Sequence, residues 1–260
     1  MTKECPQEFV DLAHRLADAA GKAIRPHFRE KIDIIGKADN SPVTIADRNA
    51  ELAMRAIIEA EYPDHGIFGE EFGEVRTDAE YVWVLDPIDG THSFISGSPT
   101  FGCLIGLTRN DIPILGVMDQ PISHERWLGA NGQSTLNDAV ISTRPCPSLP
   151  DASLFAWGAE LFQGDHEQQF RRLHQAVKRT RFGYDCYAYG LLSLGFVDAV
   201  ADCDMKPYDY CALVPIVENA GGRITDWSGE PLKLTTPGLV LATGDARLHD
   251  AILRLLNEPQ

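Results

Sequence analysis

The chain has 260 residues, of which 44% are hydrophobic and 23% are charged, and its formal net charge is −15. Such an acidic surface repels nucleic acid and anionic membranes, and the densest basic run, Lys178–Arg181, is too short to offset it. No run approaches the roughly 18 to 20 apolar residues of a membrane span, and the N-terminus does not resemble a secretory signal, so we expect a cytoplasmic protein.

Two helices are predicted at the start of the chain. Apolar residues at helical spacing predict an amphipathic helix over 7–28. A turn-rich stretch follows at 36–42, and Thr44 with Asp47 three residues later predicts the N-terminus of a second helix, which ends at 62–63. The residues expected on the buried face of this second helix are Leu52, Ala53, Ala56, Ile57 and Ala60.

Short apolar runs then predict strands. The turn at 110–111 makes the second and third of them antiparallel neighbours, and Asn131-Gly132 is typical of a hairpin turn. The predicted strands are 81–85, 101–107, 114–118 and one that contains Trp127 and Leu128.

From about residue 140 the pattern changes to an alternation of helices and strands. The predicted helices are 165–177, 185–194, 209–220 and 246–256, and the predicted strands are 179–182, 196–200, 223–226 and 238–242. Gly221-Gly222 is a suitable C-cap for the third of these helices. The whole pattern indicates an α+β half, residues 1–140, followed by an α/β half, residues 141–260.

The cysteines show neither a C-x-x-C pair nor a zinc-finger spacing, which argues against a structural metal site formed by cysteines. We expect reduced thiols that are mostly buried. The six cysteines are Cys5, Cys103, Cys146, Cys186, Cys203 and Cys211.

The segment 83–91, with the sequence WVLDPIDGT, is the most informative part of the chain. A strand delivers Asp86 and Asp89 to its carboxyl end, where sites in α/β proteins gather, and Pro87 and Gly90 force a turn. The carbonyl of Ile88 could point at the same place, and oxygen ligands of this kind suit a hard cation such as Mg²⁺. The alternative is a turn with exposed carboxylates and no function.

Two further acidic elements flank this turn. Glu70 and Glu71 lie between glycines, which by itself is typical of a solvated loop. Asp209 stands at the start of the predicted helix 209–220, where an aspartate is by default an N-cap. Neither element is decisive alone, but both occur in a fixed order around the D-P-I-D-G-T turn.

Together these residues resemble the inositol-monophosphatase superfamily, whose marks are a G-E-E loop, a W-x-x-D-P-I-D-G-T turn and a late Asp opening a helix that ends in A-G-G. The match extends from Lys37 to Asp226. The resemblance implies an α+β fold, the layered αβαβα sandwich of the inositol-monophosphatase and fructose-bisphosphatase type. It also implies a homodimer and a phosphomonoesterase that needs two to three Mg²⁺ ions.

The same resemblance implies the ligands of the ions. Glu70, Asp86 and the carbonyl of Ile88 would hold one Mg²⁺, and Asp86, Asp89 and Asp209 would hold a second. A third, weaker ion would lie near Glu70. The first half of the chain would therefore carry the two metal-binding motifs, and the second half would complete the metal and substrate site.

The catalytic roles that the resemblance implies belong to residues beside the ions. Thr91, held by Asp47, would orient the attacking water, with Glu71 as a helper, and the amides of Gly90 and Thr91 would bind the phosphate. Water would attack directly, without a phosphoenzyme.

Two rival classes fit less well. Phosphatases of the haloacid-dehalogenase type carry D-x-D-G-T after a strand and use the first Asp as a covalent nucleophile. Here the motif D-P-I-D-G-T is one residue longer, which turns the second carboxylate away, and the G-E-E loop has no place in that class. An acidic binding or chaperone module would leave so many carboxylates around one turn unexplained.

Three segments resemble the histidinol-phosphate phosphatase branch of the superfamily. Their residues are 93–102, then 115–121 with 125–127, and 183–190. Histidinol carries an ammonium group and an imidazole, so Asp185 and Asp202 could bind a cationic leaving group. Arg181 could contact the phosphate or form a local salt bridge. The alternative for Asp185 and Asp202 is a solvated acidic rim without a binding role. The alternative for the function is an inositol-1-monophosphatase or a related sugar or nucleotide phosphatase of the same superfamily.

Overall fold

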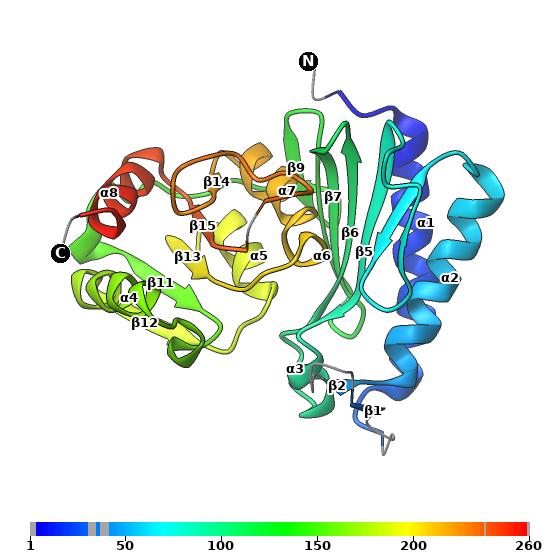
Figure 1. Cartoon of the computed structure of the whole chain (residues 1–260), viewed down its shortest axis with the longest axis horizontal. Helices are drawn as coiled ribbons and strands as arrows, with labels where there is room; N and C mark the ends of the chain where they lie inside the picture. Colours follow the sequence, from blue (N-terminus) through cyan, green and yellow to red (C-terminus); the bar gives the residue numbers. More distant parts are fainter. Residues whose placement is uncertain (1–3, 31–34, 37–41, 237, 259–260) are drawn as a thin grey trace.

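A computed structural model of the chain describes residues 4–30, 35–36, 42–236 and 238–258. Most of the expected turn-rich stretch at 36–42 lies outside these residues. Two sheets stand side by side, with helices between them and on both outer faces (Figure 1). This order of helix, sheet, helix, sheet and helix confirms the expected αβαβα sandwich.

The larger sheet has eight strands among the described residues. Across the sheet they are β10 (Ala139–Val140), β9 (Gln133–Leu136), β8 (Glu125–Ala130), β7 (Ile112–Gln120), β6 (Gly102–Arg109), β5 (Tyr81–Asp89), β3 (Gly66–Gly69) and β4 (Gly73–Val75). Only β3 and β5 pair in parallel. The central strands are buried on both faces, since helices cover both, and they therefore lack polar alternation. The predicted hairpin at Asn131-Gly132 joins β8 and β9.

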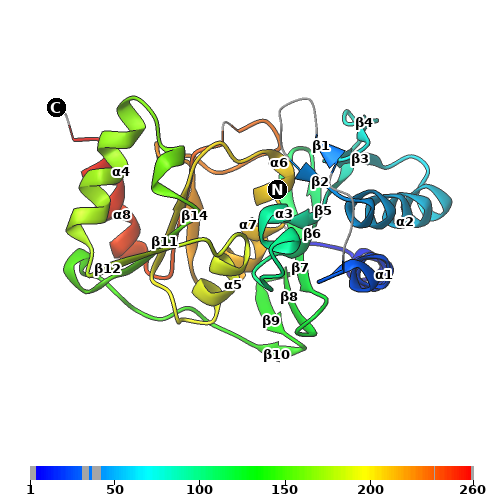
Figure 2. The same cartoon turned by 90° about the horizontal axis from the view of Figure 1, so that it is seen from below.

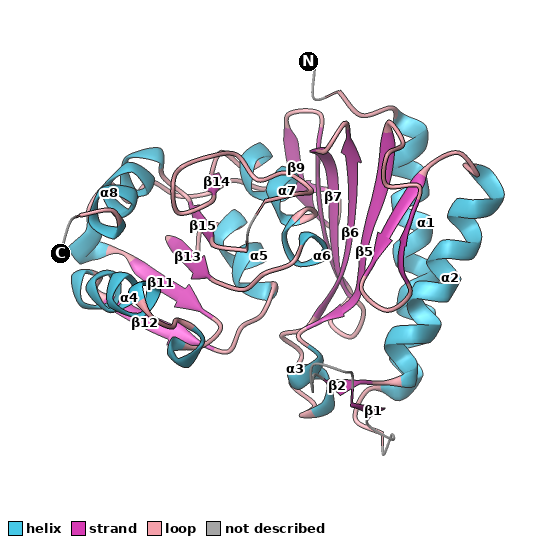
Figure 3. Cartoon of the chain, in the orientation of Figure 1, coloured by secondary structure: helices cyan, strands magenta, loops and turns pink. Residues whose placement is uncertain are grey.

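The smaller sheet is mixed. Its five described strands are, in spatial order, β12 (Arg179–Phe182), β11 (Ser153–Ala156), β13 (Ala199–Asp202), β15 (Val240–Thr243) and β14 (Arg223–Thr225). The helices α4 (Asp165–Ala176) and α8 (Ala246–Leu256) cover its outer face (Figure 3). Short 3-10 turns, η2 (Leu149–Asp151) and η3 (Ala159–Leu161), precede and follow β11, and a separate two-stranded pair joins β1 (Ile35–Gly36) to β2 (Pro42–Val43).

Two long helices cover the outer face of the larger sheet, and Figure 2 shows them side by side. The first, α1 (Gln7–Ile24), ends four residues before the predicted limit and continues as η1 (Arg25–His27). Pro26 explains the change, because it has no N–H to donate to the carbonyl four residues earlier. The second helix, α2 (Ile45–Glu61), begins with the predicted capping box of Thr44 and Asp47.

The buried face of α2 differs from the predicted one. Leu52 is 50% exposed, and Ala56 and Ala60 are exposed as well. The buried face includes two acidic residues, Asp47 and Glu51, which a pattern of apolar residues assigns to solvent. The residues buried on α2 are Ala46, Asp47, Ala50, Glu51, Met54 and Ile58.

The layer between the sheets contains short helices. They are α5 (Tyr187–Ser193), α6 (Pro207–Tyr210) and α7 (Leu213–Asn219). The predicted helix 209–220 is thus two helices, because Pro215 cannot donate to the carbonyl of Cys211. Its predicted C-cap is confirmed, since Gly221 has a φ of 94°.

Close backbone packing holds this layer against the larger sheet. A Cβ on Gly116 of β7 would lie 1.8 Å from the carbonyl oxygen of Ala212, between α6 and α7. A glycine at this position therefore lets the sheet and the inner helices meet backbone to backbone.

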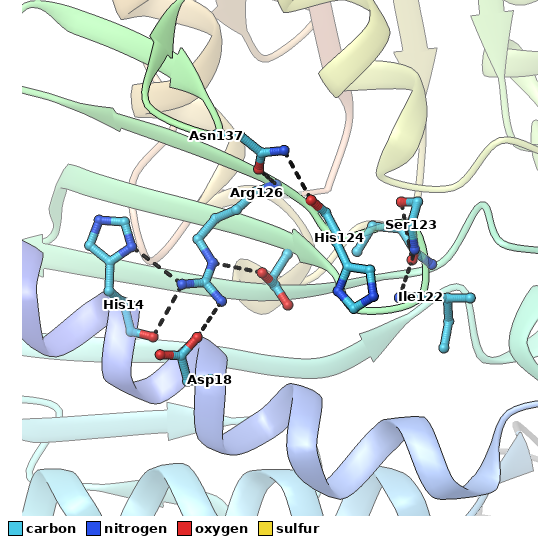
Figure 4. Close-up of polar contacts among 9 residues, drawn as sticks. His14, Asp18, Ile122, Ser123, His124, Arg126 and Asn137 are labelled. Atoms are coloured by element: carbon cyan, nitrogen blue, oxygen red, sulfur yellow. Dashed lines mark hydrogen bonds and ion pairs between the residues drawn. The ribbon is translucent and has the colours of Figure 1, made fainter.

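An ion-pair network fixes α1 on the sheet (Figure 4). The guanidinium of Arg126 on β8 donates to Asp119 Oδ1 of β7 at 2.6 Å and to Asp18 Oδ1 of α1 at 2.8 Å. It also donates to the carbonyl of His14 at 3.4 Å. Asp119 and Arg126 are opposite each other in the strand register, so the network ties two strands to one helix.

Several short elements were not predicted, namely β3, β4, β10, β11 and the helix α3 (Thr91–Ile95). The strand predicted at 196–200 lies at 199–202 instead, and the helix predicted from residue 185 begins at Tyr187. All six cysteines are free, and only Cys203 is not fully buried. None of the described helices combines the length and the apolar character that crossing a membrane requires.

His249 on α8 is completely buried against the smaller sheet. Its two ring nitrogens lie 2.8 Å from the hydroxyl of Thr225 and 3.0 Å from that of Thr243. Burial, with a smaller contribution from Arg223, lowers the pKa of His249 to about 4. The folded protein therefore binds this proton less readily than the unfolded chain.

We expect the stability of the protein to fall as the pH falls through the unfolded-state pKa of His249, near 6.5, towards 4. Between pH 7 and pH 5 this residue alone should remove about 2 kcal/mol from the free energy of unfolding. Urea unfolding of the wild type and of His249→Gln at both pH values measures it. The variant should lose about 2 kcal/mol less than the wild type over this interval, whereas equal losses would assign the pH dependence to other groups.

Candidate metal and substrate site

Strand β5 carries Asp86 and Asp89 to its carboxyl end. Its pairing with β6 is regular as far as Asp86 and then shifts before Asp89, because the intervening residues, Pro87 included, bulge out of the ladder. Oδ1 of Asp86 accepts a hydrogen bond of 3.0 Å from the N–H of Ile88. Oδ2 of Asp89 accepts one of 2.7 Å from the N–H of Cys186, just before α5. The turn is thus tied to the second half of the chain.

Helix α6 contributes a third carboxylate. The N–H of Lys206 donates to Oδ2 of Asp209 at 2.6 Å, which fixes the first turn of the helix. One oxygen each from Asp86, Asp89 and Asp209 lies within 4.8 Å of the others. The structure therefore brings together three carboxylates that the sequence predicts as metal ligands.

The G-E-E loop follows β3. The N–H of Glu70 donates to the carbonyl of Leu85 on β5 at 3.1 Å, which places this loop beside the end of β5. Glu70 lines a cavity next to these carboxylates, together with Asp89 and Asp209. Glu71, by contrast, is not among the residues that line this cavity.

The three clustered carboxylates are buried and repel one another when they are ionised. Burial raises the pKa of Asp86, Asp89 and Asp209, and neighbouring carboxylates, Glu70 among them, raise these pKa values further. Several carboxylates at this spacing cannot all be ionised without a compensating positive charge. A hard divalent cation would supply that charge, and the all-oxygen donor set is the one such ions prefer. The residues present therefore fit a metal site.

Thr91 and Asp47 are not hydrogen-bonded to each other, contrary to expectation. The hydroxyl of Thr91 donates instead to the carbonyl of Ile88 at 3.2 Å. Oδ2 of Asp47 accepts hydrogen bonds from the N–H and the hydroxyl of Thr44. Its Oδ1 is buried and has no hydrogen-bond partner among the described residues. The capping box of α2 thus uses one oxygen of Asp47 and leaves the other unpaired.

A cavity of about 220 Å³ adjoins the carboxylate cluster. Acidic side chains from four separate segments line it, together with two aromatic rings and a histidine. Its lining residues are Glu70, Asp89, Gly90, Thr91, His92, Trp157, Leu161, Asp185, Cys186, Tyr189, Asp202, Cys203, Asp204, Met205 and Asp209.

Gly90 marks the point where the D-P-I-D-G-T turn meets the second half of the chain. Its φ of 84° is a left-handed conformation, and a Cβ there would lie 2.6 Å from Cγ of Asp185. The carboxylate of Asp185 accepts hydrogen bonds from the hydroxyls of Ser93 at 2.6 Å and Thr100 at 2.9 Å, and from the indole N–H of Trp157 at 3.0 Å. Asp185 therefore joins α3 and the loop after it to the smaller sheet.

Asp202, at the end of β13, is also engaged by the protein. Its Oδ1 accepts from the N–H of Trp157 at 2.8 Å and its Oδ2 from the hydroxyl of Tyr189 at 2.9 Å. Burial raises the pKa of Asp202 to about 6. The two predicted substrate-binding acids thus hold Trp157 between them. Sequence reasoning missed Trp157, because the short strand before it carried no signal.

Arg181 does not line the cavity. It is exposed on the edge strand β12, and its guanidinium lies 5.2 Å from the ring centre of Tyr184. Arg181 pairs with Phe155 of β11, so the two side chains point to the same face of the sheet, the one directed at the layer between the two sheets. The phosphate contact and the local salt bridge both stay predictions for Arg181, whose recorded contact is the one with Tyr184.

The sequence matches a protein-family model over almost its whole length. The model described as the inositol monophosphatase family matches residues 6–260. The chain belongs to the inositol monophosphatase family. Members of this family are generally metal-dependent, in agreement with the carboxylate cluster.

Relatives within the inositol monophosphatase family are named as phosphatases. The chain is 49% identical over 258 residues to the "Bifunctional phosphatase IMPL2, chloroplastic" of Arabidopsis thaliana, covering 95% of this chain and 75% of that protein. It is 34% identical over 236 residues to the histidinol-phosphatase of Chlorobaculum parvum, covering 90% and 91%. A solved structure of an inositol monophosphatase from Zymomonas mobilis is 48% identical, with a TM-score of 0.90 and 97% and 98% coverage. The chain is a phosphoric monoester hydrolase.

Proposed function

We propose that the chain hydrolyses L-histidinol phosphate to L-histidinol and phosphate, a reaction of histidine biosynthesis, with Mg²⁺ and by direct attack of water. The observation that carries this proposal is the composition of the cavity. It is lined by Glu70, Asp89 and Asp209 and also by Asp185, Asp202 and Asp204. Divalent cations bind the phosphate of such a substrate, and carboxylates bind an ammonium or imidazolium group on the alcohol.

The metal ligands in this proposal are those that the sequence predicts. Glu70, Asp86 and the carbonyl of Ile88 would hold one Mg²⁺, and Asp86, Asp89 and Asp209 a second, with a third, weaker ion near Glu70. When bound, such ions neutralise phosphate charge, lower the pKa of a water molecule and stabilise the leaving alkoxide. The proximity of Asp86, Asp89 and Asp209 supports the ligand set proposed for the second ion.

The chain's own groups would orient the reactants. The hydroxyl of Thr91, with Glu70 and Glu71 nearby, would align the attacking water, and the N–H groups of Gly90 and Thr91 would donate to the phosphate oxygens. These N–H groups lie at the first turn of α3, where the helix provides no acceptor for them. Asp47 would act from behind this group through its unpaired oxygen. The proposal does not include Arg181.

Inositol 1-phosphate is the second candidate substrate, because the similar protein from Zymomonas mobilis is named an inositol monophosphatase. A phosphate-release screen separates the two. Histidinol phosphate, inositol 1-phosphate and nucleoside 3′-phosphates should be compared at equal concentration, with Mg²⁺ and with EDTA. We expect the highest kcat/KM for histidinol phosphate and no turnover in EDTA. A clear preference for inositol 1-phosphate would replace the first candidate with the second.

The proposal also covers assembly and organisation. We expect a cytoplasmic homodimer, for which the free cysteines and the family resemblance are the support. Sedimentation equilibrium would give a mass of two chains. We further expect the two halves to divide near residue 140, where β10 ends the larger sheet.

The recognition of the leaving group can be tested at Asp185. We expect Asp185→Asn to lower kcat/KM for histidinol phosphate by at least about tenfold more than for glycerol 2-phosphate, at the same Mg²⁺ concentration. The reason is that a desolvated charge pair is worth ~2–5 kcal/mol when one partner is removed, whereas an exposed pair is worth ~0–1 kcal/mol.

The carboxylate of Asp185 already accepts three hydrogen bonds from the protein, so a control is needed. Ser93→Ala removes one of these donors but keeps the charge, and it should affect both substrates equally. Equal losses on both substrates in Asp185→Asn would mean that Asp185 shapes the cavity and does not bind the ammonium group.

A further inference from the structure

Glu51 is a fully buried acidic residue of α2 that contacts neither the carboxylate cluster nor the cavity directly. Its Oε2 accepts a hydrogen bond of 2.7 Å from the N–H of Glu71, and its Oε1 accepts one of 3.2 Å from the N–H of Phe72. A single carboxylate thus binds two successive amides of the G-E-E loop. Anions held by backbone N–H groups in this way make strong, charge-assisted hydrogen bonds.

Arg55, one turn further along α2, completes this contact. Its Nε donates to Oε1 of Glu51 at 2.7 Å, and its Nη2 donates to the carbonyl of Gly73. The side chain of Arg55 is only 12% exposed. The pair therefore holds the loop at Glu71, Phe72 and Gly73, and the positive charge of Arg55 compensates the buried carboxylate.

Gly69, the last residue of β3, provides the space for Glu51. A Cβ on Gly69 would lie 2.0 Å from Oε1 of Glu51 and 2.6 Å from Nη2 of Arg55. Neither group can move aside cheaply, because each is buried and hydrogen-bonded to the loop. The glycine, the glutamate and the arginine therefore form one packed unit beneath the loop.

Glu70 is fixed from the opposite side. Its N–H is bound to the carbonyl of Leu85 on β5, next to Asp86. The loop is therefore held between β5 and α2, with Glu70 at the carboxylate cluster and Glu71 anchored through its amide. A one-ångström displacement of such a loop is enough to weaken a metal site, whose ligands must keep their geometry.

We infer that Glu51 is a positioning residue, which holds the G-E-E loop so that Glu70 faces the cation site. This inference rests on the proposed function, since it takes Glu70 as a metal ligand. Glu51 itself binds no ion, because its two oxygens are used by the loop amides and by Arg55. Its effect is on metal affinity and not on the chemical step.

The test uses Glu51→Gln, which keeps the shape of the side chain but loses the charge and turns an NH₂ group towards a backbone donor. We expect Mg²⁺ binding, measured by calorimetry on the metal-free protein without substrate, to weaken by about 10- to 100-fold. Hydrogen exchange should increase in the peptide that spans residues 69–73. At saturating Mg²⁺, kcat should return to within a few-fold of the wild-type value.

Matched variants separate positioning from general destabilisation. Glu61, like Glu51, is on α2, and Glu61→Gln removes its exposed ion pair with Arg15 of α1 and should leave Mg²⁺ binding unchanged. Gly69→Ala displaces Glu51 without removing any hydrogen-bonding group and should reproduce the weaker Mg²⁺ binding. Arg55→Met should destabilise the fold as Glu51→Gln does but weaken Mg²⁺ binding less, because the carboxylate still binds both amides.

Two results would overturn the inference. One is unchanged Mg²⁺ affinity in both Glu51→Gln and Gly69→Ala; the other is a loss of affinity in Arg55→Met equal to that in Glu51→Gln. Failure of the proposed function has a different signature, because the wild-type protein would then bind no Mg²⁺ and show no Mg²⁺-dependent turnover.

Discussion

Asp86→Asn should lose at least about two orders of magnitude in kcat, because this residue is shared by both proposed ions and each would lose a ligand. Asp86 is 2% exposed and lies within 4.8 Å of the carboxylates of Asp89 and Asp209. The thermal stability of the metal-free variant should not decrease along with its activity. Since burial and neighbouring carboxylates raise the pKa of Asp86, a neutral amide relieves repulsion, and thermal stability in EDTA should not fall.

Steady-state phosphate release at increasing Mg²⁺, together with thermal unfolding in EDTA, measures both effects. Asp250→Asn is a suitable control, because it removes an exposed carboxylate that pairs with Arg223 and does not line the cavity. Near-normal turnover of Asp86→Asn at saturating Mg²⁺ would exclude the two-ion assignment. A loss of activity accompanied by a large loss of stability would point to misfolding.

Gly116→Ala should destabilise the fold by about 3 kcal/mol or more, which is severe for the addition of one methyl group. The new Cβ would lie 1.8 Å from the carbonyl oxygen of Ala212 and 2.7 Å from its carbonyl carbon, so the backbone of β7 or of the α6–α7 segment must shift. The same segment carries Asp209. We therefore expect weaker Mg²⁺ binding in addition to a fall in Tm of about 6 °C or more.

Thermal unfolding in EDTA and Mg²⁺ calorimetry check the two expectations. Gly132→Asn is the matched control: this turn glycine has a φ of 79°, which Asn tolerates, and a Cβ there meets no atom within 4 Å. A Tm within one or two degrees of the wild-type value for Gly116→Ala would mean that the inner helices adjust to the sheet without cost.

Features with a local cause could be predicted from the sequence. The capping box at Thr44 and Asp47, the Asn131-Gly132 hairpin and the Gly221 cap each depend on a few adjacent residues, and the structure confirms them. The same is true of the D-P-I-D-G-T turn. Its proline, glycine and aspartates determine the bulge that brings Asp86 and Asp89 together.

Features that depend on contacts between distant segments could not be predicted in the same way. The buried face of α2 was assigned from apolar residues, but Glu51 faces inward because the loop amides and Arg55 compensate its charge. No periodicity distinguishes such a residue from a solvated one. Trp157 was missed for a similar reason, since its place depends on hydrogen bonds to Asp185 and Asp202.

Residues assigned from the resemblance or from their charge have mixed outcomes. Asp209 lies with Asp86 and Asp89, 120 residues away in the chain, whereas Arg181 is not among the residues that line the cavity. The second segment that resembles the histidinol-phosphate phosphatase branch, 115–121 with 125–127, contains Asp119 and Arg126, which join α1 to the sheet. Similarity of a segment to a branch therefore does not by itself place that segment at the substrate.

Both sheets end in strands that offer little to another chain. The larger sheet is bordered by β4, with three residues, and β10, with two; the smaller is bordered by β14, with three, and by β12, with four residues of which two are arginines. Unpaired strand edges are templates for intermolecular pairing and aggregation, and short or charged edges prevent it. The edge strands of the described residues therefore give a second copy of this chain little backbone to pair with, and we expect a dimer to be built from side chains on helices, loops or sheet faces.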